Sequence, residues 1–280
     1  MWDENAEVWT KLSRMGVNIY HDAFIAPAFI SMLPDITGLT GLDIGCGEGT
    51  DTRMLAKLGG VMTGLDVSKR FIAYAREEER RGLLGVRYKT ASAWRIPFAE
   101  DSFDFATATM SLMDVPEPER AIREAFRVIK PGGFLQFSIT HPCFDVPHRK
   151  WIDDPSGKHV AMAVSDYFGE MDGHVEEWIF HFTPPELKDK LRKFRIPRFS
   201  RTLSWWLNAI IESGFVIEYV LEPTATDEAI RKFPHLDDTR IMAHFLMIRC
   251  RKPPITKRLQ RPMTGFKKVM ERKTRRSRKS

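Results

Sequence analysis

Apolar positions along residues 39–140 switch repeatedly between short continuous runs and helical spacing. The runs predict strands, and the helically spaced segments predict the helices between them. The predicted strands cover residues 39–45, 60–67, 86–88, 103–110 and 134–140. The predicted helices cover residues 50–58, 69–81 and 118–129. This alternation predicts an α/β fold in which helices cover both faces of a parallel sheet and ligands bind beyond the carboxyl ends of the strands.

Local signals mark two of these boundaries. Ser68 is a predicted N-cap for the helix that follows it, because its hydroxyl can accept a hydrogen bond from a free amide of the first turn. Pro131, Gly132 and Gly133 are predicted to end the third helix and to turn the chain into the fifth strand.

The flanking segments complete the predicted domain. Residues 3–33 have helical spacing and are closed by Pro34. Residues 142–202 lack a clear period and are too long for a simple loop, so we expect an inserted substrate lid after the fifth strand. A helix and two strands follow, at residues 203–213, 215–221 and 243–251. They predict a hairpin-like antiparallel edge on a mostly parallel, seven-stranded sheet.

Composition allows one main domain and gives the chain a basic end. The 280 residues are 43% hydrophobic, which is enough for one sizeable core or two small ones. The net charge of +6 is unevenly divided. Residues 251–280 hold 13 lysines and arginines against one acidic residue, whereas residues 1–250 hold 30 against 36. We therefore predict one domain over residues 1–252 and a basic, disordered tail over residues 253–280.

Signals for export, membrane insertion or metal binding are weak. The longest apolar stretch, residues 23–33, contains Pro27 and is shorter than the roughly 18 residues of a membrane span. The acidic, polar start does not resemble a secretory signal. Three widely spaced cysteines, Cys46, Cys143 and Cys250, fit a reduced compartment and form no zinc ligand set. We expect a cytoplasmic protein without a transmembrane segment or a bound metal.

A glycine-rich segment from Asp43 to Gly49, DIGCGEG, stands between a predicted strand and a predicted helix. Glycines at positions 45 and 47 let a ligand approach the backbone closely, and the amides at a helix N-terminus can bind a carboxylate. Taken alone, this spacing also fits a dinucleotide-binding loop or a tight turn without a ligand.

Asp66 lies at the carboxyl end of the second predicted strand, 23 residues after Asp43. A carboxylate there can accept hydrogen bonds from both hydroxyls of a ribose, as in other nucleoside-binding α/β sheets. It can equally cap the start of the helix at Ser68, and the two roles are compatible.

Four segments in this order resemble successive motifs of class I S-adenosylmethionine-dependent methyltransferases. They are GLDIGCGEGT, GLDVS, RIPFAEDSFDFATATMSLMDV and RVIKPGGFLQFSI, and the match covers about residues 38–140. Within this class they look like the methyltransferase type 11 subgroup, which includes the ubiquinone and menaquinone C-methyltransferases and many small-molecule enzymes. The resemblance implies a Rossmann-like methyltransferase fold with S-adenosyl-L-methionine as the cofactor.

The resemblance also implies cofactor contacts. Residues of the glycine-rich segment would hold the methionine moiety, namely Asp43, Gly45, Cys46 and Gly47. Asp66 would bind the ribose, Val67 would pack on the adenine, and Met110 would line the cofactor pocket.

Ser92 and Ala93 belong to the one position that departs from the family pattern. Similar enzymes have Gly-Asp-Ala there, and the aspartate binds the adenine amino group. This chain has Ala-Ser-Ala at residues 91–93. A serine hydroxyl can accept the same hydrogen bond without a charge, so we expect Ser92 and Ala93 to contact the cofactor with lower affinity.

Methyl transfer is an in-line displacement in which the enzyme mainly aligns the acceptor and excludes water, so a base is optional. His141, directly after the fifth strand, is the first candidate because histidine can accept a proton near neutral pH. It could equally bond the loop that follows. Asp114, after the fourth strand, ranks second, and it could instead cap the next turn. Cys143 is expected to be a packed thiol rather than a nucleophile.

Two pairs of aromatic residues have both a site and a core interpretation. Trp9 and Tyr20 lie on segments that fold over the cofactor in similar enzymes. Trp205 and Trp206 could close an apolar pocket over the acceptor. All four could equally belong to the hydrophobic core, which is the commoner use of such residues.

The sequence predicts methyl transfer to a small-molecule acceptor. After the fourth strand the chain reads SLMD, not the NPPY-type motif of amine-directed nucleic-acid and protein methyltransferases. One alternative is an RNA-directed methyltransferase or binder that uses the basic tail, because clustered cations displace counterions from phosphates. Another is a non-catalytic module docked through that tail. The acceptor atom and the oligomeric state stay open, since O-, N- and C-methylating enzymes share this cofactor half.

Overall fold

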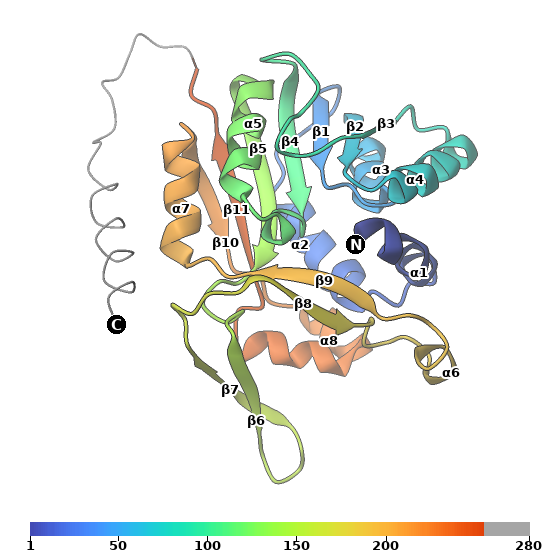
Figure 1. Cartoon of the computed structure of the whole chain (residues 1–280), viewed down its shortest axis with the longest axis vertical. Helices are drawn as coiled ribbons and strands as arrows, with labels where there is room; N and C mark the ends of the chain where they lie inside the picture. The colour runs from blue at the N-terminus through green and yellow to red at the C-terminus, as the bar shows by residue number, and fades with distance from the viewer. Residues whose placement is uncertain (255–280) are drawn as a thin grey trace.

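The computed structural model describes residues 1–254, and seven of its strands form one sheet (Figure 1). In sheet order these are β10 (Val216–Leu221), β11 (Phe245–Arg251), β5 (Ile129–Thr140), β4 (Phe103–Thr109), β1 (Thr40–Ile44), β2 (Val61–Asp66) and β3 (Arg87–Thr90). The pairs from β5 to β3 are parallel, whereas β11 is antiparallel to both β5 and β10. The predicted sheet is confirmed, and its antiparallel strand lies one position in from the edge.

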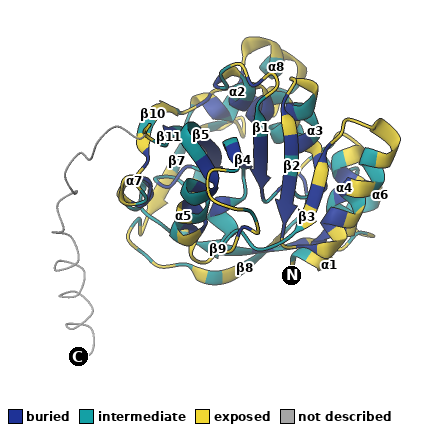
Figure 2. Ribbon diagram, turned by 90° about the horizontal axis from the view of Figure 1, so that it is seen from above, coloured by how far each residue is buried: buried dark blue, intermediate teal, exposed yellow. Residues whose placement is uncertain are grey.

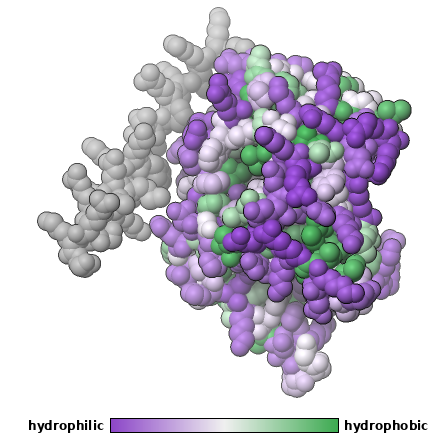
Figure 3. All heavy atoms as spheres, turned by 45° about the vertical axis from the view of Figure 1, so that its right-hand side comes forward, coloured by the Kyte–Doolittle hydropathy of each residue, from purple (hydrophilic) through white to green (hydrophobic). Residues whose placement is uncertain are grey.

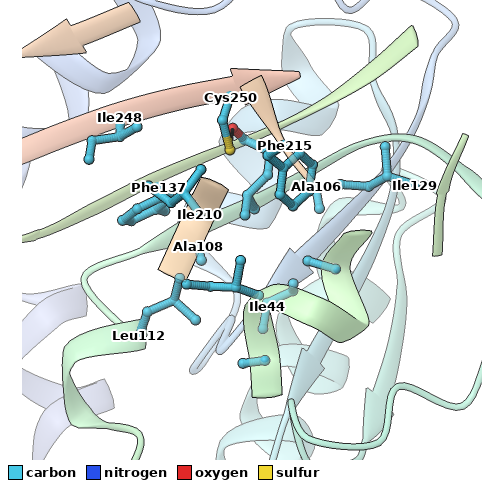
Figure 4. Close-up of a cluster of buried hydrophobic side chains, with 14 of the residues drawn as sticks. Ile44, Ala106, Ala108, Leu112, Ile129, Phe137, Ile210, Phe215, Ile248 and Cys250 are labelled. Carbon is cyan, nitrogen blue, oxygen red and sulfur yellow. Dashed lines mark hydrogen bonds between the residues drawn. The ribbon is translucent and has the colours of Figure 1, made fainter. Parts of the chain in front are cut away.

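Helices cover both faces of this sheet, as predicted. On one face α5 (Pro118–Val128) and α7 (Leu203–Glu212) bury their apolar sides against β1, β4, β5 and β11. Figure 4 shows this core, where Ile210 of α7 and Phe137 of β5 lie close together. The other face carries α2 (Ala26–Ser31), α3 (Thr50–Lys57) and α4 (Lys69–Gly82). The central strands are therefore buried on both sides, as Figure 2 shows.

The two predicted boundaries have different outcomes. Ser68 caps α4 as expected, because its hydroxyl accepts a hydrogen bond from the Phe71 amide at 3.1 Å. The third helix ends at Val128, before the Pro-Gly-Gly segment, so the prediction that Ile129 is helical is wrong. Ile129 already pairs with Phe103 of β4, and the Pro-Gly-Gly segment makes an irregularity inside β5. Gly133 is required there, since a Cβ would lie 2.3 Å from the Asp104 carbonyl oxygen.

Residues 142–202 fold mainly into two antiparallel strand pairs. These are β6 (His148–Asp153) with β7 (His159–Ser165), and β8 (Asp172–Trp178) with β9 (Phe194–Phe199). The short α6 (Pro185–Lys188) lies between β8 and β9 in sequence. In Figure 1 the β8–β9 pair runs across the carboxyl ends of the central strands, whereas β6–β7 projects away from the sheet.

The N-terminal segment, residues 1–33, contains α1 (Trp2–Arg14), a π-helix (His21–Ile25) and α2. Helix α1 is joined to β9 by two hydrogen bonds. The Asn5 side chain donates to the Arg195 carbonyl at 2.8 Å and accepts from the Arg195 amide at 3.0 Å. A separate apolar cluster fills the junction, with Leu12, Phe180, Phe194 and Ile196 at its centre. The start of the chain and residues 178–196 therefore pack as one unit.

The polar connection between β10 and β11 contains α8 (Asp227–Lys232) and a 3₁₀ helix (Pro234–Arg240), neither of which the sequence predicts. No helix within residues 1–254 combines the length and the apolar character needed to cross a membrane. The face drawn in Figure 3 is mainly hydrophilic, with hydrophobic residues in separate patches. The predicted basic tail lies, from residue 255 onward, outside the described residues.

Candidate active site

The site lies where the strand order reverses, between β1 and β4. From β1 the chain continues to β2 on one side, and from β4 it continues to β5 on the other side. The connections therefore diverge, and a crevice forms between the carboxyl ends of β1 and β4. A cavity of about 680 Å³ occupies this place, a size typical of small-molecule sites. Its walls come from the loops after β1, β3 and β4, the end of β2, the N-terminal segment and the β8–β9 region.

The glycine loop, residues 45–49, forms the floor of one end of the cavity. Gly45 has a φ of +74°, and a Cβ on it would lie 2.5 Å from the Ser111 Cβ. Gly47 has a φ of +54°, with no heavy atom within 4 Å of the Cβ position. Both conformations favour glycine, but for different reasons. Gly45 lets the loop after β4 pack closely, and Gly47 leaves the backbone open to a ligand.

Asp43, a predicted cofactor contact, lies beneath this loop and does not line the cavity. Its carboxylate accepts hydrogen bonds from the Thr52 hydroxyl at 2.6 Å and the Thr107 hydroxyl at 3.0 Å. Burial raises the pKa of Asp43 to about 7, and the two hydroxyls partly oppose that shift. The Asp43 carboxylate therefore joins β1, α3 and β4 below the glycine loop.

Asp66 lines the cavity and is 8% exposed. Its carboxylate accepts hydrogen bonds from the Gly47 amide at 2.9 Å and the Ser68 amide at 2.8 Å. Burial raises its pKa, and these two hydrogen bonds oppose the rise. The predicted capping contact is thus present, and the same carboxylate faces the cavity. Val67, which is 59% exposed, lies beside it on the cavity wall.

The other predicted cofactor contacts also line the cavity, namely Gly45, Cys46, Gly47, Ser92, Ala93 and Met110. The Ser92 hydroxyl accepts a hydrogen bond from the Trp94 amide at 3.2 Å. Met110 has a φ of +49°, and its amide donates to the Ser138 carbonyl at 3.0 Å. Next to it, the Ser111 hydroxyl donates to the Ile44 carbonyl at 2.7 Å, which ties the loop after β4 to the glycine loop.

His141, the first candidate for a base, does not line the cavity and is 2% exposed. Its Nε2 lies 2.7 Å from a Glu222 carboxylate oxygen, and its Nδ1 accepts from the Cys143 amide at 3.2 Å. Both ring nitrogens are therefore engaged within the protein. The contact with Cys143 matches the alternative interpretation, in which His141 bonds the loop that follows, and this geometry does not favour His141 as a base.

Asp114, ranked second from the sequence, lines the cavity instead. It ends a 3₁₀ turn, Leu112–Asp114, whose Leu112 side chain is fixed in the core. Burial raises the pKa of Asp114 to about 7, and the positive charge of Arg198 opposes that shift. A carboxyl group that titrates near neutral pH in a cleft is a candidate proton acceptor.

The N-terminal segment closes the cavity above the glycine loop. Trp9, Tyr20 and His21 all line the cavity, and Trp9 and Tyr20 also pack against apolar clusters. His21 begins the π-helix, a feature frequent at functional sites. Its Nε2 lies 2.8 Å from an Asp51 carboxylate oxygen, and its Nδ1 lies 2.8 Å from that of Asp22. Burial lowers the pKa of His21, but the two carboxylates outweigh it and raise the value to about 10.

The far end of the cavity has an aromatic and apolar surface that we call the acceptor wall. Its members are Trp9, Trp178, Phe180, Phe182 and Ile196. Trp9 packs against Trp178 and Phe180, with ring centroids 5.9 Å and 4.9 Å apart. Sequence reasoning missed the individual members of this wall, apart from Trp9, because residues 178–196 lack a clear period and only the fold brings them against Trp9.

Trp205 and Trp206 do not line the cavity. Trp206 is buried in the core between α7 and the sheet, and Trp205 packs partly buried against the same cluster. Their core interpretation is correct. Cys143 is a free, half-buried thiol and is not among the residues that line the cavity.

Comparisons with known proteins agree with this geometry. The methyltransferase domain family matches residues 42–137. The crystal structure of an S-adenosylmethionine-dependent methyltransferase from Mesorhizobium loti is 30% identical, with a TM-score of 0.66, and the match covers 80% of this chain and 96% of that one.

Two curated relatives are similar over a shorter part of their length. Squalene methyltransferase 2 of Botryococcus braunii is 32% identical over 170 residues, which are 60% of this chain and 42% of that protein. A ubiquinone biosynthesis O-methyltransferase of Coxiella burnetii is 34% identical over 116 residues, 41% of this chain and 50% of that protein. The chain thus spans about half the length of the curated relatives that it matches.

Proposed function

Because the chain belongs to the class I S-adenosylmethionine-dependent methyltransferases, with S-adenosylmethionine as its cofactor, we propose that it methylates an apolar small molecule held in the same cavity. One observation carries this proposal. A single cavity runs from the glycine loop and Asp66 to the acceptor wall, so it has room for a cofactor and an acceptor side by side. The cofactor supplies an electrophilic methyl group on a sulfonium.

The cofactor end offers the groups that such a molecule needs. Open backbone at Gly47 suits the close approach of the methionine moiety. The Asp66 carboxylate has two oxygens, each with one protein donor, and so retains lone pairs for the ribose hydroxyls. Val67 presents an exposed aliphatic face for the adenine, beside Ser92.

The acceptor end favours an apolar molecule. Four of the five acceptor-wall side chains are aromatic, and such surfaces bury a ligand through area and ring packing. Residues 142–202 contribute most of this wall, which supports their predicted role as a substrate lid. The names of the curated relatives, a squalene and a ubiquinone-pathway enzyme, point in the same direction.

The first test is calorimetric titration with S-adenosylmethionine and S-adenosylhomocysteine. Asp66→Ala should weaken binding about 100-fold, because it removes hydrogen bonds to a charged group worth roughly 1.5–3 kcal/mol each. The matched control is Asp35→Ala, an exposed aspartate outside the cavity, which should bind normally. Absence of binding to the folded wild type would contradict the cofactor assignment in this chain.

The second test addresses the acceptor. Formation of S-adenosylhomocysteine should be stimulated by apolar small molecules, and Trp178→Ala should raise the KM for them without changing cofactor affinity. Trp205→Ala is the control, since it removes a tryptophan outside the cavity. Methyl transfer to RNA that depends on residues 255–280 would instead support the alternative function.

A further inference from the structure

Five acidic side chains line the cavity within the described residues, and four of them have partners. Asp22 and Asp51 contact His21, Glu48 contacts Arg53, and Asp66 accepts from two backbone amides. Among residues 1–254 the Asp114 side chain has no hydrogen-bond or ion-pair partner, and only its backbone amide is engaged, by donating to the Ser111 carbonyl at 3.2 Å. Asp114 is half-buried and faces the cavity, so its carboxyl group is available to a bound ligand.

The position of Asp114 is fixed at the junction of the two halves of the cavity. It follows Met110 and Ser111, which adjoin the glycine loop, and the buried Leu112 anchors the turn that carries it. On its other side β9 brings Arg198 and Ile196 into the cavity wall. Asp114 therefore lies between the cofactor end and the acceptor wall.

Charges around Asp114 restrict the kind of acceptor. Arg198 lines the cavity, but its guanidinium already pairs with Asp145 and lies 3.7 Å from Glu176. It therefore offers no free cation for an anionic acceptor, and the ionised form of Asp114 repels an anion placed beside it. A neutral hydrogen-bond donor on an apolar molecule fits both constraints.

Other titratable groups face the same cavity from the neighbouring elements. Tyr20 and His21 come from the N-terminal segment, and His181 follows β8. Burial and the neighbouring Asp238 raise the pKa of Tyr20 well above the neutral range, and His21 is held protonated by its two carboxylates. Burial and His235 lower the pKa of His181, so at neutral pH it adds no positive charge to that of Arg198.

We propose that Asp114 is the catalytic base and that the acceptor is a neutral hydroxyl group on an apolar molecule. This inference rests on the proposed function. The acceptor oxygen uses a lone pair to form the new O–CH₃ bond, while the electrons of the breaking S–CH₃ bond stay on sulfur. The O–H electrons remain on oxygen, and its proton passes to the Asp114 carboxylate. The products are a methyl ether, S-adenosylhomocysteine and protonated Asp114, which then releases its proton to water.

The test uses 4-nitrophenol, a hydroxyl probe whose ionised form is coloured, with S-adenosylhomocysteine present. The negative charge of the Asp114 carboxylate should disfavour the ionised form of the bound probe, which then stays a neutral hydrogen-bond donor. The apparent pKa of the probe should therefore rise by about one unit, which is a tenfold change in the ratio of its two forms. Asp114→Asn should abolish this rise. Asp22→Asn, which removes a cavity carboxylate paired with His21, should retain it.

The outcomes separate the two proposals. If S-adenosylhomocysteine binds and Trp178→Ala weakens the probe, the proposed function stands whatever Asp114 does. An equal pKa of the bound probe in wild type and Asp114→Asn would then overturn the base assignment. Failure of the probe to bind wild type that binds S-adenosylhomocysteine would overturn the hydroxyl acceptor. With an identified acceptor, Asp114→Asn should lower kcat about 100-fold or more while the cofactor affinity stays unchanged. In wild type kcat should rise with pH around neutrality, and this rise should be absent from the variant.

Discussion

Asp114→Asn should make the protein more stable above neutral pH. Burial raises the pKa of Asp114 from its ordinary 3.8 to about 7 in the folded chain. A folded-state pKa above the unfolded value means that the neutral form contributes stability below about pH 4, and that this contribution is lost as the pH rises through 7. The difference corresponds to about 4 kcal/mol as an upper value, because the side chain faces a cavity that water can enter. Asparagine has nearly the same shape and does not ionise, so it escapes this loss.

Urea denaturation of both proteins between pH 4 and pH 8.5 measures this effect. The two free energies of unfolding should agree within about 1 kcal/mol at pH 4 and diverge by about 2–4 kcal/mol in favour of the variant at pH 8. Asp35→Asn is the control with the opposite sign, because a hydrogen bond from the Thr37 amide lowers the pKa of Asp35. A constant difference between wild type and Asp114→Asn at all pH values would refute the reasoning.

Three further predictions follow from the site. Gly47→Ala should abolish cofactor binding while lowering the melting temperature only slightly, whereas Gly45→Ala should mainly lower stability, because its Cβ meets Ser111; calorimetry and thermal melts distinguish them. His21→Gln should lower the free energy of unfolding at pH 7 but not above pH 10, since the stabilising charge of His21 is lost as the pH rises through about 10; equal effects at both pH values would argue against the ion pair. His141→Ala should cost about 1–3 kcal/mol of stability, from its lost contacts with Glu222 and Cys143, and should leave turnover of the folded enzyme intact, as an activity assay against the wild type would show.

The cofactor half could be predicted from the sequence because its signals are local. The strand, glycine loop and helix from β1 to α3 follow one another directly, and Ser68 sits beside the helix that it caps. The prediction at Ile129 was wrong because this apolar residue continues the helical spacing of α5, whereas in the structure it pairs with Phe103 in the sheet. The resemblance could place Asp43 near the cofactor. Only the hydrogen bonds from Thr52 and Thr107 show that its carboxylate supports the glycine loop from below instead of lining the cavity.

The lid segment of the acceptor half could be recognised as an insertion, but its strands could not be predicted, because they have no simple period. The residues of β6 and β8 are mostly exposed or half-buried on both faces, so apolar and polar positions do not alternate. A related reason explains why Asp114 reaches the cavity although the sequence ranks His141 first. Residue type favoured the histidine, whereas the direction of each side chain decides which group reaches the cavity, and Thr140 rather than His141 faces it.

The Asn5–Arg195 contact has a consequence for the evolution of acceptor choice. Four of the five acceptor-wall side chains, all but Phe182, belong to a small apolar cluster that is separate from the three clusters that hold the helices on the sheet. The cluster shares no buried residue with the core of the sheet, so we expect acceptor choice to diversify at little cost to the folding of the sheet. The two hydrogen bonds between α1 and β9 nevertheless tie the first helix to the lid strands, so we expect the two segments to change together in evolution. A chimera that exchanges residues 142–202 with a relative should therefore also carry the relative's first helix.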